Sequence, residues 1–356
     1  EKRTGRKVLS FGAGSPDYPP SPVYLEKLTE FFHETNSHLY PPYGATPEFS
    51  AALIVWYKKR FGVTLGENQL LPLLGAKDGV AHLPLALLQS GDEVLVPDPG
   101  YPGFTGPTLS VGAVPVYYDL PASDDTPIDL NKLATKITKR TKYMWVNFPS
   151  NPTGRTTNLP ELTNLIGFAK KHNIWIIYDN AYSEITFDGY VAPSILQIEG
   201  AMDVAVEIGS FSKTFSFAGY RMGWIVGNKE VIAALAKVKT QFDSGMALPL
   251  QKLGAFALTH QDKSWQDTMI ASYTKRCDII ITYLEKLGLA VTKPKGSLYL
   301  WAKIPDKEKD SESYSTRILE EKQILLTPGT AFGKNGARYV RASICVNIDH
   351  IEEYFV

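Results

Sequence analysis

The alternation of strand-like and helical stretches between about residues 46 and 230 is the feature that most constrains the fold. Short apolar runs typical of buried strands occur at 70–74, 93–96, 114–118, 143–148, 174–178 and 204–208, with helical patterns between them. A helix between two strands returns the chain to the end of the sheet at which the first strand began, so the two strands run parallel. The alternation therefore predicts an α/β fold with a mostly parallel central sheet flanked by helices.

The pattern changes after Gly245, where longer helical stretches at 248–258 and 264–287 are followed by short strand-like runs near 298–302, 324–327 and 339–343. This order of elements is typical of a smaller α+β domain. We therefore expect a large ligand-binding domain over 41–245 and a small C-terminal domain over 246–356. The segment 1–40 is expected to pack with the small domain, because its run from Phe11 to Asp17 is typical of a loop that crosses a cleft.

Composition limits the kinds of partner. The chain has 356 residues, is 44% hydrophobic, and carries 37 Lys and Arg against 37 Asp and Glu, so its charge gives no reason to expect nucleic acid or an anionic membrane. Cys277 and Cys345 are too few for a disulfide framework and too far apart for a metal knuckle, and we expect no metal. No run approaches the ~20 apolar residues of a membrane span, and the first seven residues lack a signal-peptide core. We expect a cytoplasmic protein with small-molecule ligands.

The run Ser210-Phe211-Ser212-Lys213, with Arg221 eight residues further on, carries the strongest chemical signal. A lysine amine can form a Schiff base with an aldehyde, and two hydroxyls with a guanidinium can bind a phosphate. Serine and lysine are also common on solvated loops, but this run lies between two apolar stretches, at a strand end where α/β sheets place ligands. Pyridoxal 5'-phosphate (PLP) carries both an aldehyde and a phosphate, so the motif predicts a PLP site.

Other strand ends add side chains that suit the same cofactor. Asp179 follows the apolar run 174–178, where its carboxylate either caps the next segment or pairs with the protonated pyridine nitrogen. Tyr182 is three residues further on and can donate to the phenolic oxygen of the ring. Asn151 opens an Asn-Pro-Thr-Gly sequence that either simply forms a turn or presents its amide to the same oxygen.

Four further residues are ambiguous when taken singly. Ala76 and Lys77 precede a helical stretch, whose first backbone N–H groups can bind phosphate. Tyr101 lies in a turn rich in proline and glycine and is either a lid or a ring that stacks on the cofactor. Arg341 is a cation within the apolar strand 339–343, so it requires either an internal ion pair or the carboxylate of a substrate.

Taken together, these motifs resemble the fold-type I PLP-dependent aminotransferases of classes I and II, in the order of that family and over nearly the whole chain. The resemblance implies that Lys213 is the Schiff-base lysine and 1,3-proton shuttle and that Asp179 pairs with the pyridine nitrogen. Asn151 and Tyr182 would then contact the phenolic oxygen, and Tyr101 would stack on the ring. The implied phosphate ligands are Ser210, Ser212, Arg221 and the backbone of Ala76 and Lys77.

The same resemblance implies a homodimer, in which Tyr40 reaches the phosphate of the neighbouring subunit. Gly14 matches a glycine that lies over the substrate carboxylate, and Arg341 matches the arginine that binds it. Lys77, Tyr101 and Asn151 are also expected at the substrate.

More narrowly, the stretches 75–83, 97–102, 181–185 and 192–195 resemble the branch of LL-diaminopimelate and some alanine aminotransferases. The chain departs from this branch at Ala76, where serine is usual, and at Ser216-Phe217, where Asn-Met is common.

The implied activity is transfer of an amino group from an α-amino acid, with LL-diaminopimelate or alanine as candidates, to an oxo acid such as 2-oxoglutarate. Two alternatives remain at this point. The same residues suit a β-elimination lyase that cleaves carbon–sulfur bonds, and a regulatory module could keep the fold without catalysis.

Overall fold

A seven-stranded sheet forms the centre of the computed structural model, which describes residue 5 and residues 7–355. Its strands are β2 (Leu70–Leu73), β3 (Glu93–Asp98), β4 (Val114–Asp119), β5 (Thr141–Asn147), β6 (Trp175–Asp179), β7 (Ala205–Ser210) and β8 (Gly223–Gly227). They lie in the order β2-β8-β7-β6-β5-β3-β4, and β8 runs in the direction opposite to the other six strands. The predicted α/β fold with a mostly parallel sheet is confirmed.

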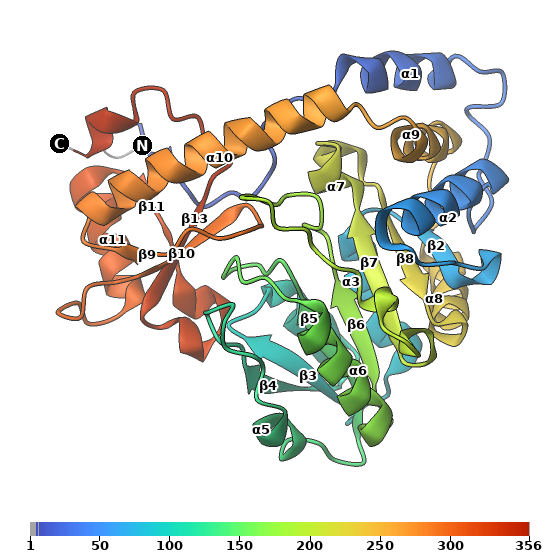
Figure 1. Ribbon diagram of the computed structural model, residues 1–356, viewed down its shortest axis with the longest axis horizontal. Coiled ribbons are helices and arrows are strands. Elements are labelled where there is room, and N and C mark those ends of the chain that lie inside the picture. Colours follow the sequence, from blue (N-terminus) through green and yellow to red (C-terminus); the bar gives the residue numbers. More distant parts are fainter. Residues whose placement is uncertain (1–4, 6, 356) are drawn as a thin grey trace.

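Helices cover both faces of this sheet (Figure 1). One face packs against α2 (Pro47–Phe61) and α6 (Leu159–His172), and the opposite face against α3 (Ala76–Leu87) and α8 (Lys229–Phe242). Shorter helices, α4 (Thr105–Ser110), α5 (Leu130–Ala134) and α7 (Phe211–Thr214), lie in the connections. Burial of both faces explains why the strands are near-continuous apolar runs.

The first predicted helix shows how local sequence sets an element. The Thr46 side chain accepts a hydrogen bond from the Phe49 backbone N–H, and Pro47 occupies the first helical position. The helix ends at Gly62, whose φ of 73° lies in the left-handed region that favours glycine. Its ends therefore lie where the sequence signals predict them.

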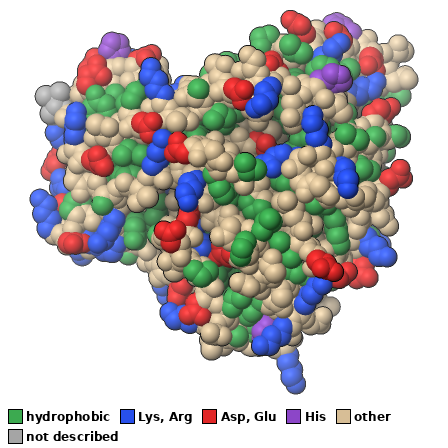
Figure 2. Space-filling model, viewed as in Figure 1, with side chains coloured by type: hydrophobic (Ala, Val, Ile, Leu, Met, Phe, Trp, Pro, Cys, Tyr) green, Lys and Arg blue, Asp and Glu red, His purple; other side chains and the backbone are tan. Residues whose placement is uncertain are grey.

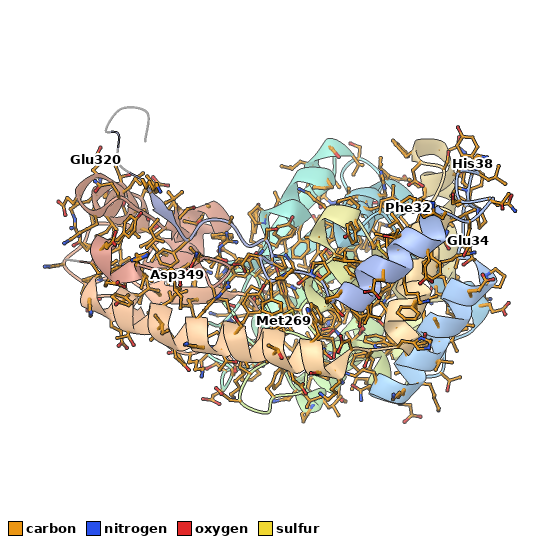
Figure 3. All side chains as sticks on the ribbon, turned by 90° about the horizontal axis from the view of Figure 1, so that it is seen from above. Phe32, Glu34, His38, Met269, Glu320 and Asp349 are labelled. Atoms are coloured by element: carbon orange, nitrogen blue, oxygen red, sulfur yellow. The ribbon has the colours of Figure 1, made fainter. Side chains whose placement is uncertain are left out.

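A separate antiparallel sheet lies toward the C-terminus and contains β9 (Ala290–Val291), β10 (Tyr299–Lys303), β12 (Thr327–Pro328) and β13 (Tyr339–Ser343). Helix α11 (Ser311–Lys322) lies in this region and α10 (Lys263–Lys286) reaches it, whereas α9 (Leu248–Thr259) packs against α2 in the larger part. The long helix α10 runs between the two parts of the molecule, as Figures 1 and 3 show from two directions.

The N-terminal segment contacts both parts. Strand β1 (Leu9–Ser10) pairs with β11 (Ile324–Leu325), whereas α1 (Pro22–Phe32) packs against α9. The division into 1–40, 41–245 and 246–356 stays a proposal.

The surface carries mixed charge. On the face shown in Figure 2, Lys and Arg side chains are interspersed with Asp and Glu. Among the described residues, no helix combines the length and apolar character that a membrane crossing needs.

Gly209, in β7, allows the close packing that holds the strand end before Ser210 in place. An added Cβ there would overlap the indole of Trp224 in β8, so Gly209→Ala should lower the free energy of unfolding by about 1–3 kcal/mol. Gly167→Ala is the matched control: a Cβ at this helical position meets nothing within 4 Å, so it should stabilise by roughly 0.5–1 kcal/mol. Chemical denaturation of both variants checks this, and equal effects would contradict it.

Candidate active site

Lys213 lies in α7, a single helical turn that begins directly after β7, at the strand end that the sequence predicts. The Ser210 hydroxyl caps this turn by accepting a hydrogen bond from the Ser212 backbone N–H at 3.1 Å. The Lys213 ammonium donates to the carbonyl of Gly14 at 2.8 Å. Burial lowers the pKa of Lys213 to about 8, so a useful share of this amine is neutral and nucleophilic near neutral pH.

Asp179 ends β6 and is buried beside Lys213. Its Oδ1 accepts a hydrogen bond from the Ala181 backbone N–H at 3.2 Å, so the local capping contact weighed from the sequence is present. Burial raises the pKa of Asp179 to about 6, although the Ala181 N–H and the Lys213 charge oppose the rise. A carboxylate in this setting would be stabilised by a cationic partner in the cavity.

Arg221 and the start of α3 form a cradle suited to an anion. The Arg221 guanidinium donates to the Ala218 carbonyl at 2.7 Å and lies against Gly75, where any Cβ would overlap it. Gly75 has a φ of 82° and provides no side-chain cap, so the first N–H groups of α3, including those of Ala76 and Lys77, are available to a ligand.

A cavity of about 230 Å³ brings these groups together. Its lining contains Ala76, Lys77, Val80, Tyr101, Asn151, Asp179, Ala181, Tyr182, Ser210, Ser212, Lys213, Ala218, Arg221 and Tyr299. All residues expected at the cofactor within one subunit are therefore neighbours in space, although they come from separate strand ends and loops.

Arg341 lies in β13 and lines an adjacent cavity of about 500 Å³ that shares Lys77, Val80 and Tyr101 with the first. Its guanidinium donates to Asn151 Oδ1 at 2.9 Å and to the Gly12 carbonyl at 2.8 Å. In the described part of the chain no carboxylate forms an ion pair with it, which disfavours the internal ion pair weighed from the sequence.

The surroundings of Arg341 make this cation available to a ligand. The guanidinium lies 4.2 Å from the ring centre of Tyr299 and 4.6 Å from that of Phe332, and its buried Nε has no partner. Burial lowers the pKa of Arg341, because the charged form loses hydration. A buried cation with an unused donor is suited to bind a carboxylate.

Three predicted site residues, Gly14, Tyr40 and Arg341, do not line the cofactor cavity itself. Gly14 lies against the Tyr299 hydroxyl, which a Cβ at this position would overlap, and its carbonyl accepts from Lys213; its place over the substrate carboxylate stays a prediction. Tyr40 lies at the surface with 87% of its area exposed.

Tyr299 and Phe332 are functional candidates that sequence reasoning missed. The Tyr299 hydroxyl lies 3.3 Å from that of Tyr182, and its ring packs on Arg341. Both aromatic residues look like ordinary core positions in the sequence. Only strand pairing, which sets β10 beside β13, identifies Tyr299 as a neighbour of Arg341.

The donor set fits PLP. It offers a buried amine for the aldehyde, a buried carboxylate for the ring nitrogen, and a helix start with a guanidinium and two serines for the phosphate. The family model for aminotransferases of class I and II matches residues 6–354. The chain belongs to the class I and II aminotransferases. Members of this family use PLP as their cofactor. Membership also implies that the substrates are amino acids and oxo acids.

Relatives support the assignment over the full length. The LL-diaminopimelate aminotransferase of Halothermothrix orenii is 38% identical over 353 residues, covering 99% of this chain and 90% of the relative. The substrate-bound structure of BacF from Bacillus subtilis has a TM-score of 0.93 and 32% identity, covering 99% of this chain and 90% of that one. The alanine aminotransferase of Pyrococcus furiosus has a TM-score of 0.90 and 26% identity, covering 99% and 92%.

The cofactor-free Asp179→Asn variant should be more stable than the unchanged protein at pH 7. The folded-state pKa of Asp179, about 6, exceeds its ordinary value of 3.8, so ionisation inside the fold costs on the order of 3 kcal/mol. This penalty is fully present above pH 6 and disappears below about pH 4, where the carboxyl is protonated in both states. Thermal unfolding between pH 4 and 8 should show the stability gap closing as the pH falls.

The control for this measurement is Asp267→Asn, which removes a carboxylate from an exposed ion pair and should produce no such gap. The Asp179→Asn variant should also bind PLP more weakly, since it loses the negative partner of the ring nitrogen. A stability gap that is independent of pH would argue against a buried, ionised Asp179.

Proposed function

We propose that this aminotransferase moves an amino group from an α-amino acid to an oxo acid such as 2-oxoglutarate, with Lys213 as the group that handles the proton. The observation that carries the proposal is the junction of the two cavities. One presents the Lys213 amine beside Asp179, and the other presents the Arg341 cation without a carboxylate partner among the described residues. An α-amino acid carries the two groups that such a pair recognises.

We assign the cofactor contacts residue by residue. Ser210, Ser212, Arg221 and the backbone of Ala76 and Lys77 would hold the phosphate. Asp179 would pair with the ring nitrogen, Asn151 and Tyr182 would contact the phenolic oxygen, and Tyr101 would stack on the ring. The chemistry that bound PLP supplies is an aldehyde carbon that exchanges amines and a ring that draws electrons from the substrate Cα.

Arg341 would bind the substrate α-carboxylate through two parallel hydrogen bonds. Each terminal nitrogen donates one hydrogen bond within the protein, to Asn151 Oδ1 and to the Gly12 carbonyl, and carries a second N–H; these second N–H groups and the unpartnered Nε support the proposal. Fixing the carboxylate sets the direction of the Cα–H bond relative to the Lys213 amine, which is how positioning lowers the barrier.

Lys213 would then take the proton from the substrate Cα and return it one step later. A lysine with its ordinary pKa is almost fully protonated near pH 7 and is a poor base. The pKa of about 8 brings its amine close to the range in which one group both accepts and donates a proton. Tyr182 and Tyr299 lie beside it with raised pKa values, mainly because of burial, so both hydroxyls remain protonated donors.

For the donor we propose LL-diaminopimelate first and alanine second. Support for LL-diaminopimelate comes from relatives of that name with 35–38% identity. The cavity beside Arg341 has room for a long side chain and is lined by Lys77, Tyr101 and Phe332, among others. The departures at Ala76 and Ser216-Phe217 are the reason for testing a panel of donors.

We also propose a homodimer. Phe32, Leu39, Tyr40 and Tyr43 are large side chains that are all more than half exposed on one chain. Phe32 and the nearby His38 lie at the end of the molecule that is remote from Asp349 (Figure 3). Such a group of exposed apolar side chains suits an interface between subunits, and Tyr40 would reach the partner's phosphate site. A cytoplasmic location is part of the proposal and fits the two free thiols.

The deciding experiment is a half-reaction followed by absorbance. Purified protein with PLP is titrated with LL-diaminopimelate, alanine, glutamate and phenylalanine in separate samples. A true donor should abolish the visible absorption of the lysine-linked cofactor, and 2-oxoglutarate should restore it. Release of pyruvate and ammonia from cystathionine, without any donor passing its nitrogen on, would instead support a lyase.

Lys213→Ala should remove measurable turnover with every donor, because no other described residue places a buried amine in the cofactor cavity. Steady-state assays check the loss, and the visible absorption of the lysine-linked cofactor should also be absent. Lys77→Ala is the matched control, since this exposed lysine lines the same cavity and its loss should leave turnover measurable. Retained turnover in Lys213→Ala would overturn the mechanism.

Arg341→Gln should lower kcat/KM for α-amino acids by roughly 10²–10⁴-fold, because the carboxylate loses its charged partner. Single-turnover rates with simple amines that lack a carboxylate should change by less than about threefold. The comparison separates carboxylate binding from general damage. Equal losses with both kinds of donor would assign Arg341 a structural role.

A further inference from the structure

A chain of buried charges lies directly behind the start of α3. Lys239, from α8, is only 3% exposed at its side chain, and its ammonium contacts the carboxylates of Asp78 and Asp243. The distance to Asp243 Oδ2 is 2.7 Å, and the side chain of Asp78 is 6% exposed. Helices α3 and α8 pack against each other on one face of the sheet, so this contact lies inside the protein.

The Asp78 carboxylate is folded back over the first turn of α3. Asp78 is the third residue of that helix, and its Oδ2 also accepts a hydrogen bond from the Leu74 backbone N–H at 2.8 Å. Its Oδ1 lies 2.6 Å from His82 Nδ1, one turn further along. The carboxylate is therefore held next to Ala76 and Lys77, whose backbone N–H groups are the proposed phosphate ligands.

This arrangement creates an electrostatic conflict. A carboxylate in the first turn of a helix is favourable for the helix by itself, because it interacts with the positive end of the macrodipole. A phosphate dianion requires the same positive end, and a like charge nearby repels it most strongly where water is excluded. An uncompensated Asp78 would weaken the site that α3 offers.

We propose that Lys239 neutralises Asp78 so that the start of α3 can bind the cofactor phosphate. Lys239 is thus a positioning residue that acts on the phosphate through Asp78. The inference rests on the proposed function, in which α3 holds the phosphate. It adds a residue from α8 that does not line the cavity and that lies 161 positions along the chain from its partner.

A purely structural role for the same ion pair has different consequences. If the pair only fastens α8 to α3, removing either partner should weaken cofactor binding, and the presence of a phosphate on the ligand should not matter. If Lys239 acts through charge, the two removals have opposite signs. Removing Lys239 leaves Asp78 and Asp243 without their shared cation, whereas removing the charge of Asp78 leaves Lys239 paired with Asp243 alone.

The experiment compares binding of PLP and of pyridoxal, which lacks the phosphate, to the cofactor-free protein at pH 8. Binding is followed by absorbance and tryptophan fluorescence. Lys239→Met should weaken PLP about tenfold or more and pyridoxal by less than about threefold. Asp78→Asn, whose amide oxygen can still accept from Leu74, should leave PLP affinity unchanged or higher.

The double variant Asp78→Asn/Lys239→Met keeps the inference testable if Lys239→Met folds poorly. It lacks both charges and should restore PLP affinity to within about threefold of the unchanged protein. Asp243→Asn is the matched control, because it removes the other carboxylate partner of Lys239 and should leave the ratio of PLP to pyridoxal affinity unchanged. Thermal unfolding of each variant reports its stability separately.

A control on the phosphate site separates the possible failures. Arg221→Gln should weaken PLP far more than pyridoxal; if it does not, the proposed phosphate site is wrong. If Arg221→Gln behaves as expected but Lys239→Met and Asp78→Asn weaken both ligands alike, the inference about Lys239 is overturned and the pair only fastens the helices.

Discussion

The loss of hydration at charged groups is the constraint on which this site depends. Lys213, Asp179 and Arg341 all lie in or beside one enclosed region, and for each of them burial is the largest influence on the pKa. Each group is held in a state that water would not favour: an amine that loses its proton easily, a carboxylate that resists ionisation, and a guanidinium with an unused donor. Ligands that carry the complementary groups relieve these costs, so binding specificity and chemical reactivity have the same physical origin.

The fold supports these costs by placing the groups at the ends of strands that are buried on both faces. Asn147 illustrates the coupling between adjacent strands: its amide donates to the Asp179 carbonyl at 2.9 Å, and its oxygen accepts from the Asn151 N–H at 2.8 Å. The end of β5 and the end of β6 therefore cannot move independently. Close packing of Gly209 on Trp224 does the same for β7 and β8. The desolvated side chains of the site are therefore held in position by strand ends that are tied to one another.

The sequence was sufficient for the sheet and for most of the lining of the cofactor cavity, because those residues follow local signals. Strand ends, helix starts and turns are visible in a few neighbouring residues, and Lys213, Asp179 and Asn151 each follow such a signal. Contacts between distant segments leave no local trace. The packing of Tyr299 on Arg341 depends on the register of β10 and β13, and the contact of Arg341 with the Gly12 carbonyl depends on the path of the N-terminal segment. The pairing of Asp78 with Lys239 depends on how α3 and α8 pack.

The buried pair behind α3 illustrates how electrostatics links parts of the structure that do not touch the ligand. Asp243, the second partner of Lys239, accepts a hydrogen bond from the Gly245 N–H at 2.8 Å, and a Cβ at Gly245 would lie 2.6 Å from the Pro42 carbonyl. Pro42 belongs to the loop that carries Tyr40. A continuous set of contacts thus leads from the first turn of α3 through α8 to the exposed loop that we propose for the subunit interface. In the proposed homodimer, neighbouring residues of one chain would therefore influence both phosphate sites. Asp78 and Lys239 would set the charge balance at the phosphate site of their own subunit, and the loop near Asp243 would position Tyr40 toward the phosphate site of the partner.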